Sequence, residues 1–175
     1  MDSVSNTINS LHLFTEINKK QEYTLEKVSA SDLIQKLKSN LKTLIDEKNA
    51  LISFSNNTNL DFIVCSEISI ALILQNLIQN GIKYNISSPP KIDITLNSKG
   101  EELFFRITDN GIGISKEFLQ YIFLPFKTLD SKSKTGSSGL GLAICSQLAS
   151  NLEGRIEVES ELNTGSVFTL YFKKN

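Results

Sequence analysis

The sequence predicts an α+β fold of two layers, in which helices cover one face of a mixed, largely antiparallel sheet. Apolar residues recur at helical spacing in about three main segments, and they alternate with polar residues in about five principal strand-like segments. Turn residues join most of the strand-like segments directly, as in hairpins. Amphipathic helices and an antiparallel sheet bury their apolar faces against each other, which gives the two layers.

Composition limits the chain to an ordinary globular class. Its 175 residues, 40% hydrophobic and 21% charged, suit one domain with a short appendage. A formal net charge of -1, with Lys and Arg spread along the chain, argues against nucleic acid as a partner. Cys65 and Cys145 lie far apart and His12 is the only histidine, so a disulfide framework or a zinc site lacks residues. Without a signal-like N-terminus or an apolar run of ~18 residues, we expect a cytoplasmic segment with no direct membrane contact.

The first half of the chain is predicted to alternate helices with short strands. Helices are indicated by apolar residues at helical spacing and by serines that can cap them, strands by short apolar runs between turn residues. An asparagine-rich turn separates the second and third strands, and the sequence SSPP ends the third helix. The elements expected are a helix over residues 4–20, a strand over 23–28, a helix over 29–48, strands over 50–56 and 60–64, and a helix over 66–85.

The second half is predicted to consist mainly of hairpins. Two strand pairs surround turns that contain glycine, and a glycine-opened helix lies between the pairs. A polar stretch rich in Lys, Ser and Thr has no apolar period and is typical of a mobile loop. The elements expected are strands over residues 91–97 and 102–109, a short helix over 115–122, the polar loop over 127–138, a helix over 139–152, and strands over 154–160 and 166–173.

A polar stripe on the third helix is the first candidate site. Asn76, Asn80, Lys83 and Tyr84 fall within an arc of roughly 100° on a helical projection, whereas the apolar residues gather on another side. Asparagine is a poor helix former because its amide competes for backbone hydrogen bonds. Two asparagines four residues apart therefore indicate either a solvated helix face or a ligand.

Two glycine-rich segments are the other candidates. DNGIGI, beginning at Asp109, follows an apolar strand, where glycines permit a tight turn or a close approach to a ligand. TGSSGLGL, beginning at Thr135, places glycines at a helix N-terminus, where free N–H groups favour an anion such as phosphate. A strand-ending turn and a flexible helix lead-in remain the alternatives. Neither segment matches the P-loop or the dinucleotide fingerprint, so a different nucleotide site is indicated.

In order and spacing, these segments resemble the ATP-binding catalytic domain of sensor histidine kinases. That domain belongs to the GHKL ATPase superfamily, which also includes gyrase, mismatch-repair ATPases and a major class of heat-shock chaperone. NLIQNGIKYN is similar to the N box, DNGIGI to the first glycine box, FLPF to the F box and GSSGLGLAI to the second glycine box. The resemblance covers about residues 25–173 and implies a Bergerat-type two-layer sandwich that holds ATP and Mg²⁺.

The resemblance implies a role for each matching residue. Asn80 would supply an oxygen ligand to Mg²⁺, and Asp109 would accept from the adenine amine with the Ser166 hydroxyl beside it. Gly111 and Gly113 would let the chain approach the base. The other implied nucleotide contacts are Lys83 at the phosphates, Tyr84 at the adenine or ribose, and backbone amides near Gly139, Leu140 and Gly141 around phosphate oxygens.

The loop before the second glycine box would form a lid over the nucleotide. By resemblance, Phe123 and Phe126 would anchor one end of this lid, with core packing as the alternative role. The lysines Lys127, Lys132 and Lys134 either neutralise triphosphate charge or are simply solvated. This sequence has Gly81 where the N box usually has Ala, and Ser137–Ser138 where a Thr-Gly pair is frequent.

The position of Asn76 favours phosphoryl transfer over hydrolysis. Hydrolases of the superfamily carry there a Glu that activates water, and an amide cannot act as a general base. The resemblance therefore implies a protein-histidine kinase, and we assign Asn76, Asn80 and Lys83 to its catalytic centre. A nucleotide-binding module without turnover and a GHKL-type ATPase are the alternatives.

The phosphoacceptor is expected on another domain. His12 is followed by Leu13, whereas the resemblance implies an acceptor His followed by Asp or Glu. Residues 1–22 resemble the end of a dimerisation hairpin, and residues 23–175 the catalytic domain. The implied partners are a histidine phosphoacceptor and dimerisation domain and a response regulator. The full-length protein is expected to form a homodimer and to carry any membrane anchor upstream.

Overall fold

The structure is a computed structural model that describes residues 8, 11, 12, 15, 24–127 and 138–175. Residues 8, 11, 12 and 15 are helical and exposed, in agreement with the helix predicted over 4–20. The rest of that helix, and most of the polar loop predicted over 127–138, lie outside the described residues. The division at residue 22 stays a prediction. In the part of the chain that is described, the helices include none that is both long and apolar enough to cross a membrane.

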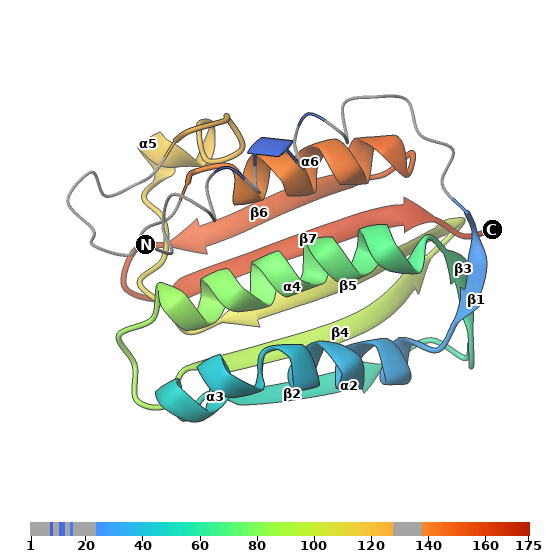
Figure 1. Cartoon of the computed structure of the whole chain (residues 1–175), viewed down its shortest axis with the longest axis horizontal. Coiled ribbons are helices and arrows are strands. Elements are labelled where there is room, and N and C mark those ends of the chain that lie inside the picture. Colours follow the sequence, from blue (N-terminus) through green and yellow to red (C-terminus); the bar gives the residue numbers. More distant parts are fainter. Residues whose placement is uncertain (1–7, 9–10, 13–14, 16–23, 128–137) are drawn as a thin grey trace.

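A five-stranded mixed sheet forms one layer (Figure 1). Strands β2 and β4 run parallel, and every other neighbouring pair is antiparallel, which confirms the predicted sheet. In spatial order the strands are β2 (Leu51–Asn56), β4 (Lys91–Lys99), β5 (Glu102–Asp109), β7 (Gly165–Lys173) and β6 (Arg155–Glu161).

Helices cover one face of this sheet and form the second layer (Figure 1). They are α2 (Ala30–Asn40), α3 (Lys42–Lys48), α4 (Glu67–Lys83) and α6 (Gly141–Asn151), with the short α5 (Lys116–Leu119) at one end. Serine caps start two of them, since Ser29 accepts from the N–H of Asp32 at 3.3 Å and Ser66 from the N–H of Ser69 at 3.4 Å. The two-layer α+β fold is therefore confirmed.

The core lies between the layers. Alternate residues of the central strands, such as Ile94, Phe105 and Leu170, are at most 1% exposed, and they face the fully buried Ile73 and Leu74 of α4. Each such side chain contributes roughly 1.5–3 kcal/mol through its removal from water. The core thus fixes α4 over the middle of the sheet.

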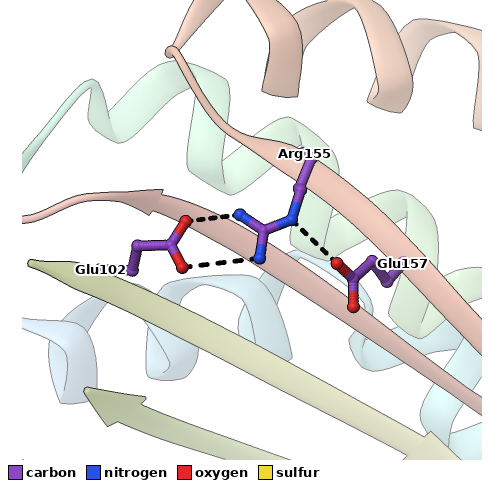
Figure 2. Close-up of polar contacts among 3 residues, drawn as sticks. All are labelled: Glu102, Arg155 and Glu157. Carbon is purple, nitrogen blue, oxygen red and sulfur yellow. Dashed lines mark hydrogen bonds and ion pairs between the residues drawn. The ribbon is translucent and has the colours of Figure 1, made fainter. Parts of the chain in front are cut away.

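The opposite face of the sheet is polar and partly aromatic. Arg155 on β6 reaches Glu102 on β5 with both terminal nitrogens, and its Nε donates to Glu157 at 2.8 Å (Figure 2). The guanidinium lies 3.9 Å from the centre of the Tyr171 ring on β7. This group joins the three strands at the edge of the sheet, with cation–π contact added to the ion pairs.

Three local predictions differ from the structure. The helix predicted over 29–48 is broken at Leu41, which takes φ -95° and ψ 6°. The strands predicted over 50–56 and 60–64 enter different sheets, because β3 (Ile63–Cys65) pairs with β1 (Glu26–Val28) in a separate antiparallel pair. The helix predicted over 115–122 is only the four residues of α5, followed by turns. Apolar spacing continues through the break at Leu41, so the pattern alone does not reveal it.

Candidate active site

An amide pair dominates the polar stripe of α4. The Nδ2 of Asn80 donates to the Oδ1 of Asn76 at 3.1 Å, and both side chains are half-buried. A side-chain amide has a carbonyl end and an NH₂ end, so a neighbour that accepts from the NH₂ end orients the oxygen away from itself. This geometry leaves Oδ1 of Asn80 available to bind a cation. Oxygen is the ligand atom that Mg²⁺ prefers. Lys83 and Tyr84 are exposed at the end of the helix.

The N-terminus of α6 abuts this amide pair. A Cβ on Gly141, the first residue of α6, would lie 2.7 Å from Nδ2 of Asn76. The missing side chain therefore lets the start of α6 approach the stripe closely. Leu140 at the N-cap is fully buried and has no side-chain acceptor for the first-turn N–H groups. Those groups and the helix dipole favour an anion beside Asn76.

Asp109 ends strand β5 on the helix-covered face. Its Oδ1 accepts from the N–H of Gly111 at 2.8 Å and from the N–H of Ser166 at 3.3 Å. Burial raises the pKa of this carboxyl, and the two backbone hydrogen bonds oppose that rise. Among the described residues both bonds end on Oδ1, so Oδ2 is available to a donor from outside the chain.

Gly81 connects the amide pair with Asp109. A Cβ at this buried position would lie 3.1 Å from Cβ of Asp109 and 2.7 Å from Cδ1 of Ile92. Asp109 therefore packs against α4 one residue after Asn80. The structure thus brings a carboxylate, an outward amide oxygen and a helix N-terminus into one region.

The first glycine box is enclosed by the chain itself. A Cβ on Gly111 would lie 2.6 Å from the carbonyl oxygen of Tyr84, and one on Gly113, where φ is +68°, would lie 2.0 Å from the carbonyl oxygen of Glu161. The N–H of Ile112 donates to the carbonyl oxygen of Tyr84 at 3.0 Å. These glycines are required by the fit between α4 and the last hairpin, a reason that is independent of any ligand.

Ser166 lies beside Asp109 as expected, although its hydroxyl has another partner. The register pairs Ser166 with Asp109 on one side and with Ser160 on the other. Its N–H binds Asp109, whereas its Oγ lies 2.9 Å from Oγ of Ser160. Sequence reasoning missed Ser160. Residues two apart on a strand share one face, so the alternation in the last hairpin could have placed Ser160 on the same face as Ser166.

Asn110 and Asn85 are two further residues that sequence reasoning missed. Oδ1 of Asn110 accepts from the N–H of Lys91 at 2.7 Å and from Nδ2 of Asn85 at 2.8 Å. The same Asn85 nitrogen donates to the carbonyl oxygen of Gly81 at 3.2 Å. These bonds tie the end of α4 to the residue that follows Asp109, and they hold the two halves of the site in register.

The two ends of the predicted lid meet next to α6. The N–H of Phe126 donates to the carbonyl oxygen of Gly139 at 2.9 Å, and both residues have positive φ. Phe126 is 62% exposed, whereas Phe123 packs partly buried against the core. Core packing therefore accounts for Phe123 and not for Phe126. Lys127 is exposed, and Lys132, Lys134 and Ser137 lie outside the described residues.

Comparison with known proteins shows the family of this chain. The family described as histidine kinase-, DNA gyrase B- and HSP90-like ATPase matches residues 65–175. Phytochrome-like protein Cph1 of Synechocystis is 34% identical over 137 residues, which cover 78% of this chain and 18% of that protein. Histidine protein kinase SaeS of Staphylococcus epidermidis is 31% identical over 177 residues, which cover 99% of this chain and 48% of that protein. The chain thus spans less than half the length of these relatives.

Solved structures share the fold. The catalytic domain of histidine kinase ThkA has a TM-score of 0.74 at 26% identity, over 86% of this chain and 96% of that one. Full-length ShkA in complex with AMPPNP has a TM-score of 0.85 at 24% identity, over 97% and 36%. ThkA in complex with the response regulator protein TrrA has a TM-score of 0.79 at 22% identity, over 98% and 48%.

The site, the family match and the named kinases among the relatives lead to one assignment. The chain belongs to the histidine kinase-, DNA gyrase B- and HSP90-like ATPase family, and it is an ATP-binding catalytic domain of the histidine kinase type.

Proposed function

We propose that this domain binds Mg²⁺-ATP and transfers the γ-phosphate to a histidine of a phosphoacceptor domain. One observation carries the proposal: Asn80, oriented by Asn76, lies on α4 next to Gly81, whose Cα packs against Asp109. A cation ligand and a base-recognising carboxylate are therefore one helical step apart. Phosphoryl transfer depends mainly on positioning and charge neutralisation, which such a site supplies.

The residues present fit ATP. Oδ2 of Asp109 would accept from the exocyclic amine of adenine, a group that guanine replaces with a carbonyl. The N–H groups at the start of α6 and the ammonium of Lys83 would face phosphate oxygens, with backbone near Gly139 and Gly141 around them. Tyr84 would flank the adenine or ribose, and the exposed Phe126 would contact the lid.

The donor set also fits Mg²⁺. Oδ1 of Asn80 would be the protein ligand, because Mg²⁺ in nucleotide sites takes few protein oxygens and completes its shell with phosphate and water. Bound there, the ion neutralises charge that develops on the transferred phosphoryl group. The orienting bond from Asn76 supports this role, since it keeps the NH₂ end of Asn80 away from the cation.

Asn76 supports transfer to a protein acceptor over hydrolysis. It occupies the place of the water-activating Glu, and its amide can neither remove nor store a proton at neutral pH. Its contacts with Asn80 and Gly141 give it a positioning role in the catalytic centre instead. Lys83 is the third residue that we assign to this centre, as a cation for the phosphates.

The partners proposed for the whole protein follow from its relatives. We propose a histidine phosphoacceptor and dimerisation domain, a homodimeric full-length protein, and a response regulator that receives the phosphate, as TrrA is bound by ThkA. His12 is exposed and lacks an acidic neighbour, so the acceptor is expected elsewhere. Because ATP and response regulators are cytoplasmic, we propose a cytoplasmic location for the domain.

Transfer of radiolabel tests this function. The domain is incubated with γ-labelled ATP, Mg²⁺ and a separately supplied acceptor domain, with Asn80→Ala and Asp109→Asn as controls. Acid-labile label on the acceptor, absent with both variants, is the expected result. Nucleotide binding without transfer would favour a regulatory module, and rapid phosphate release without acceptor would favour an ATPase.

A further inference from the structure

The Ser160 hydroxyl lies at a junction of β6, β7 and the loop after β5. Its Oγ accepts from the N–H of Ile114 at 2.8 Å and lies 2.8 Å from the carbonyl oxygen of Gly165. It also lies 2.9 Å from Oγ of Ser166. The sheet register sets Ser160, Ser166 and Asp109 in a row across three strands, on the face covered by helices. Directly opposite side chains of one face are neighbours, so this row leads to the carboxylate of the site.

Counting protons fixes the direction of the serine pair. A hydroxyl has one proton and two lone pairs. The carbonyl oxygen of Gly165 can only accept, so the contact of 2.8 Å takes the proton of Ser160. The N–H of Ile114 takes one lone pair of Ser160, and the other faces Ser166. The proton of Ser166 must therefore point to Ser160, which leaves Ser166 only lone pairs for any other neighbour.

An acceptor at Ser166 has a chemical consequence for the base site. Ser166 is 6% exposed and its own N–H binds Asp109, so the two side chains are neighbours and would form one wall of the proposed base site. With the carboxylate, this wall presents acceptors only. A water held between Asp109 and Ser166 would donate one proton to each of them. It would therefore present only a lone pair to the base.

We propose that Ser160 is a specificity-determining positioning residue, which holds Ser166 as an acceptor and thereby favours adenine over 6-oxopurines. Adenine carries an amine donor at position 6, whereas hypoxanthine and guanine carry a carbonyl acceptor. This inference rests on the proposed function, because it takes Asp109 to be the base-recognising residue. Asp109 alone already rejects a carbonyl, and Ser160 adds to that rejection by keeping the Ser166 proton away from the base.

Equilibrium binding of ADP and IDP in the presence of Mg²⁺ tests the proposal. IDP differs from ADP at position 6 and in the proton on N1. Ser160→Ala frees the Ser166 proton to donate to the IDP carbonyl, so the ratio of the Kd for IDP to the Kd for ADP is expected to fall about three- to tenfold, the effect of one hydrogen bond. Ser160→Thr keeps the hydroxyl, and the ratio is expected to stay within about twofold of wild type.

The Ser166→Ala background provides the matched control. Without the Ser166 hydroxyl, the further change Ser160→Ala is expected to alter the ratio less than about twofold, because the two residues act through one hydrogen bond. Ser166→Ala alone is expected to lower the ratio, and this variant serves if Ser160→Ala does not fold. Equal weakening of both nucleotides by Ser160→Ala, or an unchanged ratio in Ser166→Ala, would overturn the proposal. Failure of the wild-type domain to bind ADP would instead overturn the proposed function.

Discussion

At the scale of single residues, the contacts of Asn76 and Asn80 give a reason for two poor helix formers inside α4. Asn80 gives its NH₂ end to Asn76, so its oxygen end is directed outward without a further partner in the helix. Asn76 in turn fits because Gly141 has no side chain. The pair would therefore couple the proposed cation ligand, Asn80, to the start of α6, where phosphate would lie.

Removal of the Asn80 amide is expected to abolish the Mg²⁺ dependence of nucleotide affinity. The wild-type domain should bind ATP more tightly with Mg²⁺ than with EDTA, and Asn80→Ala should reduce that difference to less than about twofold through loss of the oxygen ligand. Titration calorimetry with both buffers measures it. Gln79→Ala, the preceding amide on α4, is the control and should retain the wild-type difference. An Mg²⁺ effect that survives Asn80→Ala would show that the metal ligand lies elsewhere.

Asp109→Asn is expected to weaken nucleotide binding without lowering the stability of the fold. The Kd for ADP should rise about tenfold or more, because a hydrogen bond to a charged acceptor is lost. The apo domain at pH 7 should be no less stable, since the Asn oxygen can still accept from Gly111 and Ser166 while the cost of burying a charge disappears. Titration calorimetry gives the Kd and thermal unfolding gives the stability.

The difference in unfolding stability between wild type and Asp109→Asn depends on pH, because the pKa of Asp109 is raised. The native carboxyl holds its proton more firmly than the unfolded one, so the native state binds more protons between the ordinary Asp pKa of about 3.9 and the raised value. Wild type therefore gains stability relative to Asp109→Asn as pH falls through this window.

Asp93→Asn, on the open face of β4, is the control for ADP affinity. A loss of several degrees in the melting temperature of apo Asp109→Asn at pH 7 would contradict this account.

At the scale of elements, α4 organises the site because it touches both of its other parts. Gly81 allows α4 to lie close to the end of β5, and Gly141 allows the start of α6 to lie close to α4. The Asn85–Asn110 bond then ties the end of α4 to the chain after β5. Small residues at these positions are required by the distances between elements, so the site depends on helix placement as much as on the polar side chains.

Gly81→Ala tests this packing together with Ile92→Val. Alanine improves helix propensity by about 1 kcal/mol, but here its methyl would meet Cδ1 of Ile92 at 2.7 Å. Ile92→Val removes that atom at a cost of roughly 0.5–1.5 kcal/mol. We expect Gly81→Ala to be more favourable in the Ile92→Val background by at least about 0.5 kcal/mol, as measured by denaturant unfolding. Strict additivity of the two changes would show that the methyl finds space without moving Ile92.

At the scale of the whole molecule, local patterns predict the elements better than their partners. Alternation and turn residues identify β4, β5, β6 and β7, which form the hairpins β4–β5 and β6–β7. The parallel pairing of β2 with β4 and the separate β1–β3 pair are non-local, and nothing in the short apolar runs encodes them.

The same distinction applies to the site. Asn80 could be singled out because asparagine is a poor helix former, and Asp109 because its segment resembles the first glycine box. Ser160 and Asn110 could not, because serine on a strand and asparagine in a turn are ordinary until the register brings them to Asp109. Their roles depend on which strand lies beside which.

Binding of ADP by the wild-type domain is the most direct test of the central claim, that α4, β5 and α6 form a Mg²⁺-adenine nucleotide site. Titration calorimetry with Mg²⁺ should give one site per chain that prefers ADP to IDP, and thermal unfolding should shift upward with ADP concentration as linkage requires. A folded domain that binds neither ADP nor ATP at millimolar nucleotide would contradict the account.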